Sequence, residues 1–179
     1  MFSVVIPTIW SIPQYTSKLV NNLVSCDIID DVIIIDNMPE KYIYNNIYTH
    51  TKIKRVQMSE NIFVNPSWNL GVSLSKNEHI IICNDDVIIE PSEMLEFLLI
   101  ESNNWNAVGL GPNCYEEFHP DTYTLNDITK RTFGWGCLMA VKKSKWITIP
   151  DSLKIFYGDD FILKVYDKIK NLELPFRIN

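Results

Sequence analysis

The stretch 31-DVIIID-36 places four consecutive apolar residues, three of them isoleucine, between two carboxylates. The run has no alternation of apolar and polar residues, which is typical of a parallel strand covered on both faces. Further apolar runs at Phe2–Pro7 and His79–Cys83 predict two more strands, and Ile53–Met58 predicts a weaker one. Amphipathic segments separate these runs, so the stretch belongs to a repeated alternation of strand and helix.

The spacing of apolar residues also predicts the remaining elements. We expect helices at 14–24, 65–75, 91–102 and 160–171, and strands at 107–111 and 138–141. Asn65 is the expected N-cap of the second helix, because Pro66 follows it in the first turn. Cys114 to Arg131 is expected to be a polar loop. The prediction is therefore one α/β domain over residues 1–179, with three α/β/α layers and a mainly parallel, mixed sheet.

Composition and charge limit the possible functions. The chain has 179 residues, of which 46% are hydrophobic and 21% charged, as in ordinary globular proteins and unlike disordered or coiled-coil chains. Its formal net charge is −6, which argues against nucleic acid as a partner because phosphate contact requires a basic face. An acidic protein still binds an anionic ligand when a divalent cation lies between them.

Further features bear on location. The N-terminal residues carry no cationic segment, no apolar run reaches the length of a membrane span, and the four cysteines form no CxxC pattern. We therefore expect a cytoplasmic protein without a membrane span. Abundant isoleucine (25) and asparagine (17) with only two alanines indicate AT-rich coding, as in a virus or a low-GC host. A viral origin would place the protein in the host cytoplasm.

Acidic residues follow the predicted strands. Asp36 closes one strand, Asn84-Asp85-Asp86 closes another, and Asp159-Asp160 opens the last helix. In open parallel sheets, ligands bind outside the carboxyl ends of the strands. Carboxylates gathered there repel one another unless a hard cation such as Mg²⁺ or Mn²⁺ is present. A single Asp after a strand is also a common turn former or helix cap, so both explanations stay open for Asp36.

The motifs then carry a resemblance. In chain order, 4-VVIPT-8, 32-VIIIDN-37, 69-NLG-71 and 80-IIICNDDV-87 resemble the nucleotide-sugar half of family 2 glycosyltransferases with the GT-A fold. The later 134-GWGCLMAV-141 and 157-YGDD-160 are similar to the acceptor-side strand and the acidic base motif of that family. The resemblance covers residues 2 to 167. It implies a donor-binding half at about 1–90 and an acceptor and catalytic half at about 105–179.

The resemblance also implies residue roles. Pro7, Thr8, Asp36, Asn69 and Asp85 would contact the nucleotide-sugar. A further group would hold the metal and act on the acceptor: Asn84 and Asp86 at the ends of the DXD motif for Mn²⁺ or Mg²⁺, and Asp160, or alternatively Asp159, as general base.

Trp135 and Gly136 are candidates for contact with the sugar. An indole ring beside glycines offers a stacking face and lets a ligand approach the backbone. A buried aromatic residue beside a bend explains the same residues equally well.

The implied reaction transfers one sugar from a nucleotide-sugar, by default a UDP-sugar, to the hydroxyl of a glycan or other acceptor, with inversion. A cation stabilises the charge on the leaving phosphate, and a carboxylate base accelerates hydroxyl attack by about 10²- to 10⁴-fold. Asn37 and Asn84 stand where many relatives have Asp, and Gly158 precedes the acidic pair in place of Glu. GDP- and dTDP-sugars remain alternative donors, and a partner domain or subunit would complete the acceptor site.

A nucleotidyltransferase would show a basic glycine-rich loop where Thr8-Ile9-Trp10-Ser11 stands. A non-catalytic module that binds nucleotide or sugar stays open because Asn84 replaces Asp. The letters 157-YGDD-160 also match the metal-binding turn of RNA-dependent polymerases, but this acidic chain continues for only 19 residues beyond Asp160. That leaves no room for a polymerase thumb.

Overall fold

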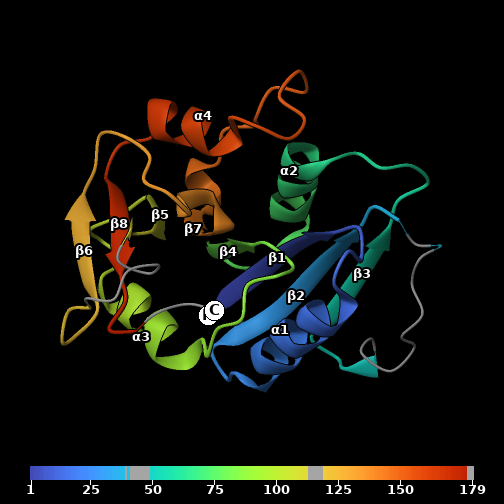
Figure 1. Ribbon diagram of the computed structural model, residues 1–179, viewed down its shortest axis with the longest axis horizontal. Helices are drawn as coiled ribbons and strands as arrows, with labels where there is room; N and C mark the ends of the chain where they lie inside the picture. Colours follow the sequence, from blue (N-terminus) through green and yellow to red (C-terminus); the bar gives the residue numbers. More distant parts are fainter. Residues whose placement is uncertain (39, 41–48, 113–118, 177–179) are drawn as a thin grey trace.

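One mixed sheet of eight strands runs through the computed structural model, which describes residues 1–38, 40, 49–112 and 119–176 (Figure 1). Its order is β3-β2-β1-β4-β7-β5-β8-β6. The strands are β1 (Phe2–Thr8), β2 (Ile29–Asp36), β3 (Ile53–Gln57), β4 (His79–Cys83), β5 (Ala107–Leu110), β6 (Thr124–Asp127), β7 (Leu138–Lys142) and β8 (Ile169–Glu173). The helices are α1 (Pro13–Ser25), α2 (Val64–Leu74), α3 (Ser92–Ile100) and α4 (Gly158–Val165).

The first half of the sheet is parallel throughout. β1 pairs with β2 on one side and β4 on the other, and β2 pairs with β3. Successive residues of β1 enter opposite cores, Val4 on one face and Val5 on the other, so both faces of the strand are apolar. This explains the unbroken apolar runs in the sequence.

The helices cover both faces of this sheet. Apolar residues of α1 and α3 share one buried cluster with one face of the strands, and residues of α2 and α4 share a second cluster with the other face. Figure 1 shows α1 and α3 below the sheet and α2 and α4 above it. The predicted α/β/α domain with a mainly parallel, mixed sheet is confirmed.

The predicted strands at 2–7, 31–36, 53–58, 79–83, 107–111 and 138–141 are confirmed, with ends that differ by at most two residues. The predicted helices at 14–24, 65–75 and 91–102 are confirmed to the same tolerance.

The expected N-cap at Asn65 is wrong. Phe63 occupies the N-cap with φ 67°, and Asn65 lies inside the helix, fully buried. Its side-chain amide donates to carbonyl groups of a distant loop, described below, instead of accepting from the first helical turn.

The expected helix at 160–171 is wrong in its second half. α4 ends at Val165, Lys168 adopts φ 51°, and the chain continues as β8 between β5 and β6. Ile169 and Leu172 are spaced three apart, which fits a helical face, yet both are buried in the sheet. A short apolar pattern of this kind does not distinguish the periodicity of a helix from that of a strand.

The expected polar loop from Cys114 to Arg131 is wrong in part, because it contains the edge strand β6. This strand pairs antiparallel with β8 and is only partly buried, so it needs few apolar residues. Cys114 lies outside the described residues. Within the described part of the chain, no helix combines the length and apolar character that crossing a bilayer would need.

Candidate active site

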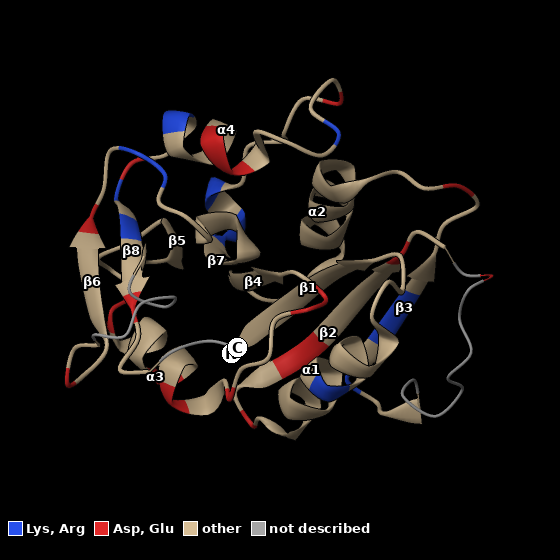
Figure 2. Cartoon of the chain, viewed as in Figure 1, with Lys and Arg blue, Asp and Glu red and all other residues tan. Residues whose placement is uncertain are grey.

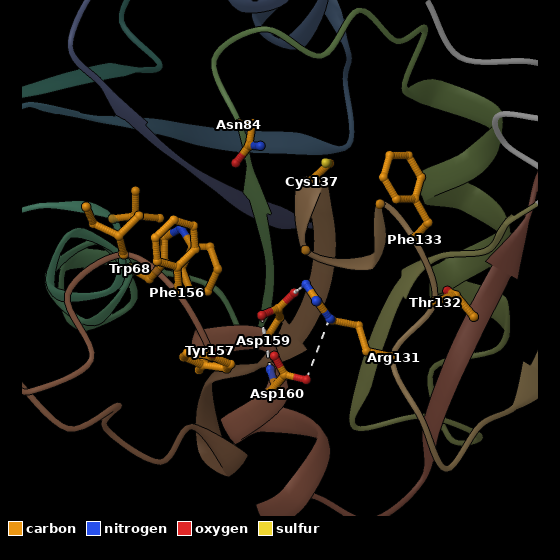
Figure 3. A pocket seen from close by; sticks show the side chains of 14 residues that line it. Trp68, Asn84, Arg131, Thr132, Phe133, Cys137, Phe156, Tyr157, Asp159 and Asp160 are labelled. Atoms are coloured by element: carbon orange, nitrogen blue, oxygen red, sulfur yellow. Dashed lines mark hydrogen bonds and ion pairs between the residues drawn. The ribbon is translucent and has the colours of Figure 1, made fainter.

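A cavity of about 790 Å³ opens at the carboxyl edge of β4. Its walls come from distant segments: Val64 and Trp68 of α2, Asn84 after β4, the segment Arg131–Cys137 before β7, and the segment Ile155–Asp160 that leads into α4. Figure 3 shows their side chains converging on one space. The volume lies within the range of small-molecule sites in proteins.

The antiparallel strand β7 explains why the 131–137 segment reaches this edge. β7 begins where β4 ends, with Leu138 opposite Cys83. The backbone N–H of Asn84 donates to the carbonyl oxygen of Cys137 at 2.9 Å. A segment that enters an antiparallel strand therefore lies beside the carboxyl end of its parallel neighbour.

Two neighbouring carboxylates in the cavity have different surroundings. Asp159 is nearly buried, and its two oxygens accept from Arg131 Nη1 at 2.9 Å and from the backbone N–H of Asp160 at 3.1 Å. The side chain of Asp160 is 43% exposed, and its Oδ1 lies 3.6 Å from Arg131 Nε. Both carboxylates thus line the cavity, and Asp160 is the more exposed of the two (Figure 3).

Arg131 links both carboxylates, and its own side chain is about half exposed. The hydrogen bond to Asp159 and the charge of that carboxylate raise the pKa of the Arg131 guanidinium above its ordinary value. Both carboxylates lie in the first turn of α4, where the helix dipole favours negative charge, and Lys164 lies in the last turn (Figure 2).

Gly136 is required by the position of Asp159. A Cβ atom at Gly136 would lie 2.8 Å from Asp159 Oδ2, which is closer than side chains approach. The carboxylate of Asp159 therefore occupies the space beside Gly136, and the predicted approach of a ligand to this backbone stays a prediction.

Helix α2 fixes the loop that carries the acidic pair. Asn65 Nδ2 donates to the carbonyl oxygens of Leu153 at 2.8 Å and Phe156 at 3.3 Å, and Asn65 N–H donates to Lys154 O at 3.0 Å. A Cβ on Gly158 would collide with Asn65 Oδ1. Asn65 therefore holds the backbone of the residues just before Asp159 in a fixed position.

Asn69 performs a similar task one turn later. Its Nδ2 donates to Ile149 O at 2.9 Å, and its Oδ1 accepts from Ile149 N–H at 3.0 Å and Trp146 Nε1 at 3.2 Å. The structure thus places the Asn69 amide against the 146–149 segment. Its predicted contact with a nucleotide stays a prediction.

Asp36 lies at the carboxyl end of β2 with no exposed surface. One oxygen accepts from Trp10 Nε1 at 2.8 Å and from the backbone N–H of Met38 at 3.0 Å. The other accepts from Arg55 Nε at 2.8 Å and forms an ion pair with the same guanidinium. A base or ribose would have to displace one of these donors to reach Asp36.

The ends of β1 and β4 are tied together. The buried Thr8 hydroxyl donates to Asp85 Oδ2 and accepts from Trp10 N–H at 2.9 Å. Burial raises the pKa of Asp85 above its usual value, the Thr8 hydrogen bond acts in the opposite direction, and the neighbouring Asp86 charge raises it further. Asp86 itself is exposed, and Pro7 lies half-buried within β1.

The structure places Trp135 in the core. The ring has no exposed surface, its Nε1 donates to Lys170 O at 3.1 Å, and it packs directly on Gly109. In this conformation the indole offers no face for a sugar, in keeping with the structural explanation for the residue.

No group of three or more His, Cys, Asp or Glu side chains gathers for a metal among the described residues. Asn84 and Asp86 nevertheless supply hard oxygen donors at the end of β4, and Asp86 is open to solvent. Mg²⁺ commonly binds through one or two carboxylates together with substrate phosphates. These donors fit an ion that shares its shell with a diphosphate, but not an ion held by protein alone.

Three further residues contribute to the candidate site and were not predicted from the sequence: Arg131, Asn65 and Trp68. Arg131 was a weak signal as one of only three arginines, placed just before the Gly134–Gly136 bend. Asn65 and Trp68 fitted a cap and an apolar core position, and nothing local indicated the distant loop that they meet.

Neither a protein-family model nor a curated protein sequence matches this chain. Solved structures match it over almost its whole length. S. aureus TarS 1–349 in complex with UDP matches with a TM-score of 0.69 and 19% identity, over 99% of this chain and 59% of that one. The complex with UDP-GlcNAc gives 0.68 and 19%, over 99% and 57%.

HddC from Yersinia pseudotuberculosis matches with a TM-score of 0.64 and 16% identity, over 96% of this chain and 89% of that one. At these identities the likeness shows a shared fold, which is of the GT-A type. The chain spans about three fifths of the length of the TarS 1–349 chains.

Proposed function

We propose that this chain transfers one sugar from a nucleotide-sugar, a UDP-sugar first among the candidates, to a hydroxyl acceptor. The observation that carries the proposal is the cavity that has Asn84 of the β4 end on one wall and the half-exposed carboxylate of Asp160 on the other. The fold is shared with structures of TarS that hold UDP and UDP-GlcNAc. A donor at the strand ends would therefore face a base across the cavity.

We assign the base to Asp160. Asp159 has both oxygens engaged and is nearly buried, whereas Asp160 lines the same cavity with its side chain 43% exposed. In the proposed step the acceptor hydroxyl gives its proton to the Asp160 carboxylate while its oxygen bonds to the anomeric carbon. The bond from that carbon to the phosphate oxygen breaks, and the nucleoside diphosphate leaves. Attack opposite the leaving group inverts the anomeric centre.

Asp159 and Arg131 keep Asp160 in place. The carboxylate of Asp159 accepts from the N–H of Asp160 and so fixes the first turn of α4. Arg131 balances part of the negative charge of the pair. Loss of either residue would disturb the orientation of Asp160 relative to the donor, and small misplacements of a base lower the rate strongly.

Asn84 and Asp86 are the residues that would hold Mn²⁺ or Mg²⁺ with the donor phosphates. The ion would stabilise the charge that develops on the leaving diphosphate. Thr8 and Asp85 hold the β1 and β4 ends together beneath this place. Their hydrogen bond would keep Asp86 in reach of the phosphates.

Calorimetric titration tests the donor site. UDP, GDP and dTDP are titrated into the chain with Mn²⁺ and again with EDTA. We expect UDP to bind with Mn²⁺, and Asp86→Ala to weaken binding at least about 10-fold, since a hard cation loses its only carboxylate ligand from the protein. Asp27→Ala, an exposed change in the turn before β2, is the matched control and should bind as the parent does.

The outcomes separate the candidate functions. Absence of binding by every nucleotide in Mn²⁺ would contradict the proposal. Release of UDP from a UDP-sugar that is lost in Asp160→Asn, with UDP binding retained, supports transfer. Nucleotide binding without any turnover would instead indicate a binding module.

A further inference from the structure

The mouth of the cavity carries an unusual set of exposed aromatic side chains. Phe133 is 80% exposed, Phe156 74% and Tyr157 67%. Of the four most exposed large apolar side chains in the described part of the chain, these are three, and all three line the cavity. Figure 3 shows Phe133 on one side of the acidic pair, with Phe156 and Tyr157 on the other.

A loose loop does not explain this exposure. Asn65 holds the backbone at Lys154 and Phe156 through hydrogen bonds of 3.0 and 3.3 Å. Tyr157 adopts φ 65°, a left-handed conformation that non-glycine residues disfavour, and its carbonyl accepts from Phe161 N–H at 2.9 Å. The backbone is thus fixed in a strained form that leaves the rings in solvent, a feature that clusters at ligand-binding sites.

The wall behind these rings contains an unsatisfied donor. Trp68 lines the cavity and is 4% exposed, and its Nε1 has no hydrogen-bond partner among the described residues. Buried polar groups in native proteins are nearly always paired, so a ligand oxygen is a natural partner. Because Nε1 is covered in the free chain, binding must shift a neighbouring side chain to uncover it.

The charges in the cavity limit the ligand. Its ionised lining groups are Asp159, Asp160 and Arg131, which sum to one negative charge, and Asn84 is neutral. A phosphorylated or carboxylated acceptor would meet net repulsion beside the base. A plain alkyl chain would leave the Trp68 donor and these polar groups without partners.

We infer that the acceptor is a neutral saccharide whose ring stacks on Phe156, with Phe133 facing it across the mouth of the cavity. Sugar rings carry C–H groups on their faces and hydroxyl groups around their rims. The C–H groups meet the negative faces of aromatic rings, a rim hydroxyl reaches Trp68 Nε1, and another reaches Asp160. This inference rests on the proposed function and names the acceptor class for the same site.

Saturation-transfer NMR tests the inference on the full chain with Mg²⁺ and UDP. The probes are lactose, cellobiose, maltose and N,N′-diacetylchitobiose, with glycerol 3-phosphate and n-hexanol as anionic and apolar comparisons. We expect at least one disaccharide to receive saturation through its C–H protons, and neither comparison compound to do so. Phe156→Ala should weaken that disaccharide by about 5- to 10-fold and leave UDP affinity unchanged.

Two variants sharpen the result. Phe176→Ala removes an aromatic side chain that packs on Tyr123 away from the cavity and should change nothing. Trp68→Phe replaces the indole with a smaller aromatic ring that has no N–H, and should weaken binding of the disaccharide by a smaller factor of about 3.

The failures are distinguishable. UDP binding with no disaccharide binding, or binding of glycerol 3-phosphate or n-hexanol alone, overturns the saccharide inference and leaves the proposed function standing. Equal loss in Phe156→Ala and Phe176→Ala also overturns it. Absence of UDP binding overturns the proposed function and the inference together.

Discussion

Two arginine–aspartate pairs lie at the same edge of the sheet and differ in their access to solvent. Asp36 is fully buried and its partner Arg55 has a side-chain exposure of 18%, whereas Asp160 and Arg131 are 43% and 49% exposed. Asp36 is surrounded by donors from three segments. The carboxylate of Asp160 faces the cavity. The same chemical pair therefore joins elements in one half of the molecule and leaves a carboxylate accessible in the other.

This difference follows from the sheet. β2 and β3 are parallel neighbours, so Arg55 lies beside the strand that Asp36 ends, and the pair closes over the core. On the other half, β7 runs antiparallel and brings Arg131 in from a loop toward a helix start. The segment before β7 and the first turn of α4 meet at their ends, and the cavity lies between them. An ion pair between two strands stabilises the fold, whereas an ion pair between such ends is open to a ligand and can take part in a reaction.

The largest expected effect comes from removing the accessible carboxylate. Asp160→Asn should lower kcat for sugar transfer by about 10²- to 10⁴-fold, because no other lining carboxylate has a free approach to the acceptor. UDP affinity and the unfolding midpoint in urea should stay near those of the parent. Initial-rate kinetics with UDP release as the readout measure the change.

Asp159→Asn is the matched control for that prediction. It should lose more stability than Asp160→Asn and less activity, because Asp159 holds Arg131 and the start of α4. The reverse order of activities would move the base to Asp159 and contradict the assignment made from exposure.

The next largest effect is a difference in stability loss between variants of Arg55 and Arg131. Arg55→Met should lower the free energy of unfolding by about 3 kcal/mol, since it leaves Asp36 buried with fewer partners. Arg131→Met should change stability by less than about 1 kcal/mol, because its guanidinium is half exposed and the nearly buried Asp159 still accepts from the N–H of Asp160. Urea denaturation followed by circular dichroism measures both, and equal losses would show that the two pairs do not differ in kind.

The two halves of the sheet also differ in how well the sequence predicts their strands. In the parallel half, β1, β2 and β4 could be predicted because each contains consecutive apolar residues followed by a polar residue, as in 31-DVIIID-36. The mixed half contains the partly polar edge strand β6 and the strand β8, whose Ile169 and Leu172 fit a helix equally well. Strands of this kind are specified by their neighbours, which the local sequence does not reveal.

The residues of the candidate site likewise differ in whether the sequence indicates them. Asn84 and Asp160, which both line the cavity, could be proposed from the sequence because polar and acidic residues at the ends of strands and helices stand out there. Asn65 could not be found, since its partners Leu153 and Phe156 lie about ninety positions away. Arg131 gains its meaning only from the antiparallel β7 that places it beside Asp159.

A third prediction concerns Asn65, which holds the loop that precedes Asp159 and Asp160. Asn65→Ala should lower the free energy of unfolding by about 2 kcal/mol, because the carbonyls of Leu153 and Phe156 lose their donor. It should also lower kcat by about 10-fold with little change in UDP affinity, since the segment before Asp160 loosens. Asn69→Ala is the control, because it releases the 146–149 segment instead and should cost stability with a smaller loss of kcat.

The smallest effect lies at the opposite, amino-terminal edge of the sheet and has no role in the site. His79 begins β4, where its ring lies 5.6 Å from that of Phe2 and 5.5 Å from that of Trp105. Burial, and then the charge of Lys142, lower the pKa of His79 below its usual 6.5. As pH falls below about 6.5, His79 takes up a proton in the unfolded chain before it does so in the folded chain, so the free energy of unfolding decreases.

The contribution of His79 should be less than about 1 kcal/mol between pH 7 and pH 5, because the ring is only partly buried. His79→Gln removes the titrating group, so the variant should lose part of the parent's decline in stability over that interval. Urea midpoints at pH 5, 6 and 7 give the comparison. An unchanged pH dependence would mean that other titrating groups cause the decline, and it would contradict the contribution assigned to His79.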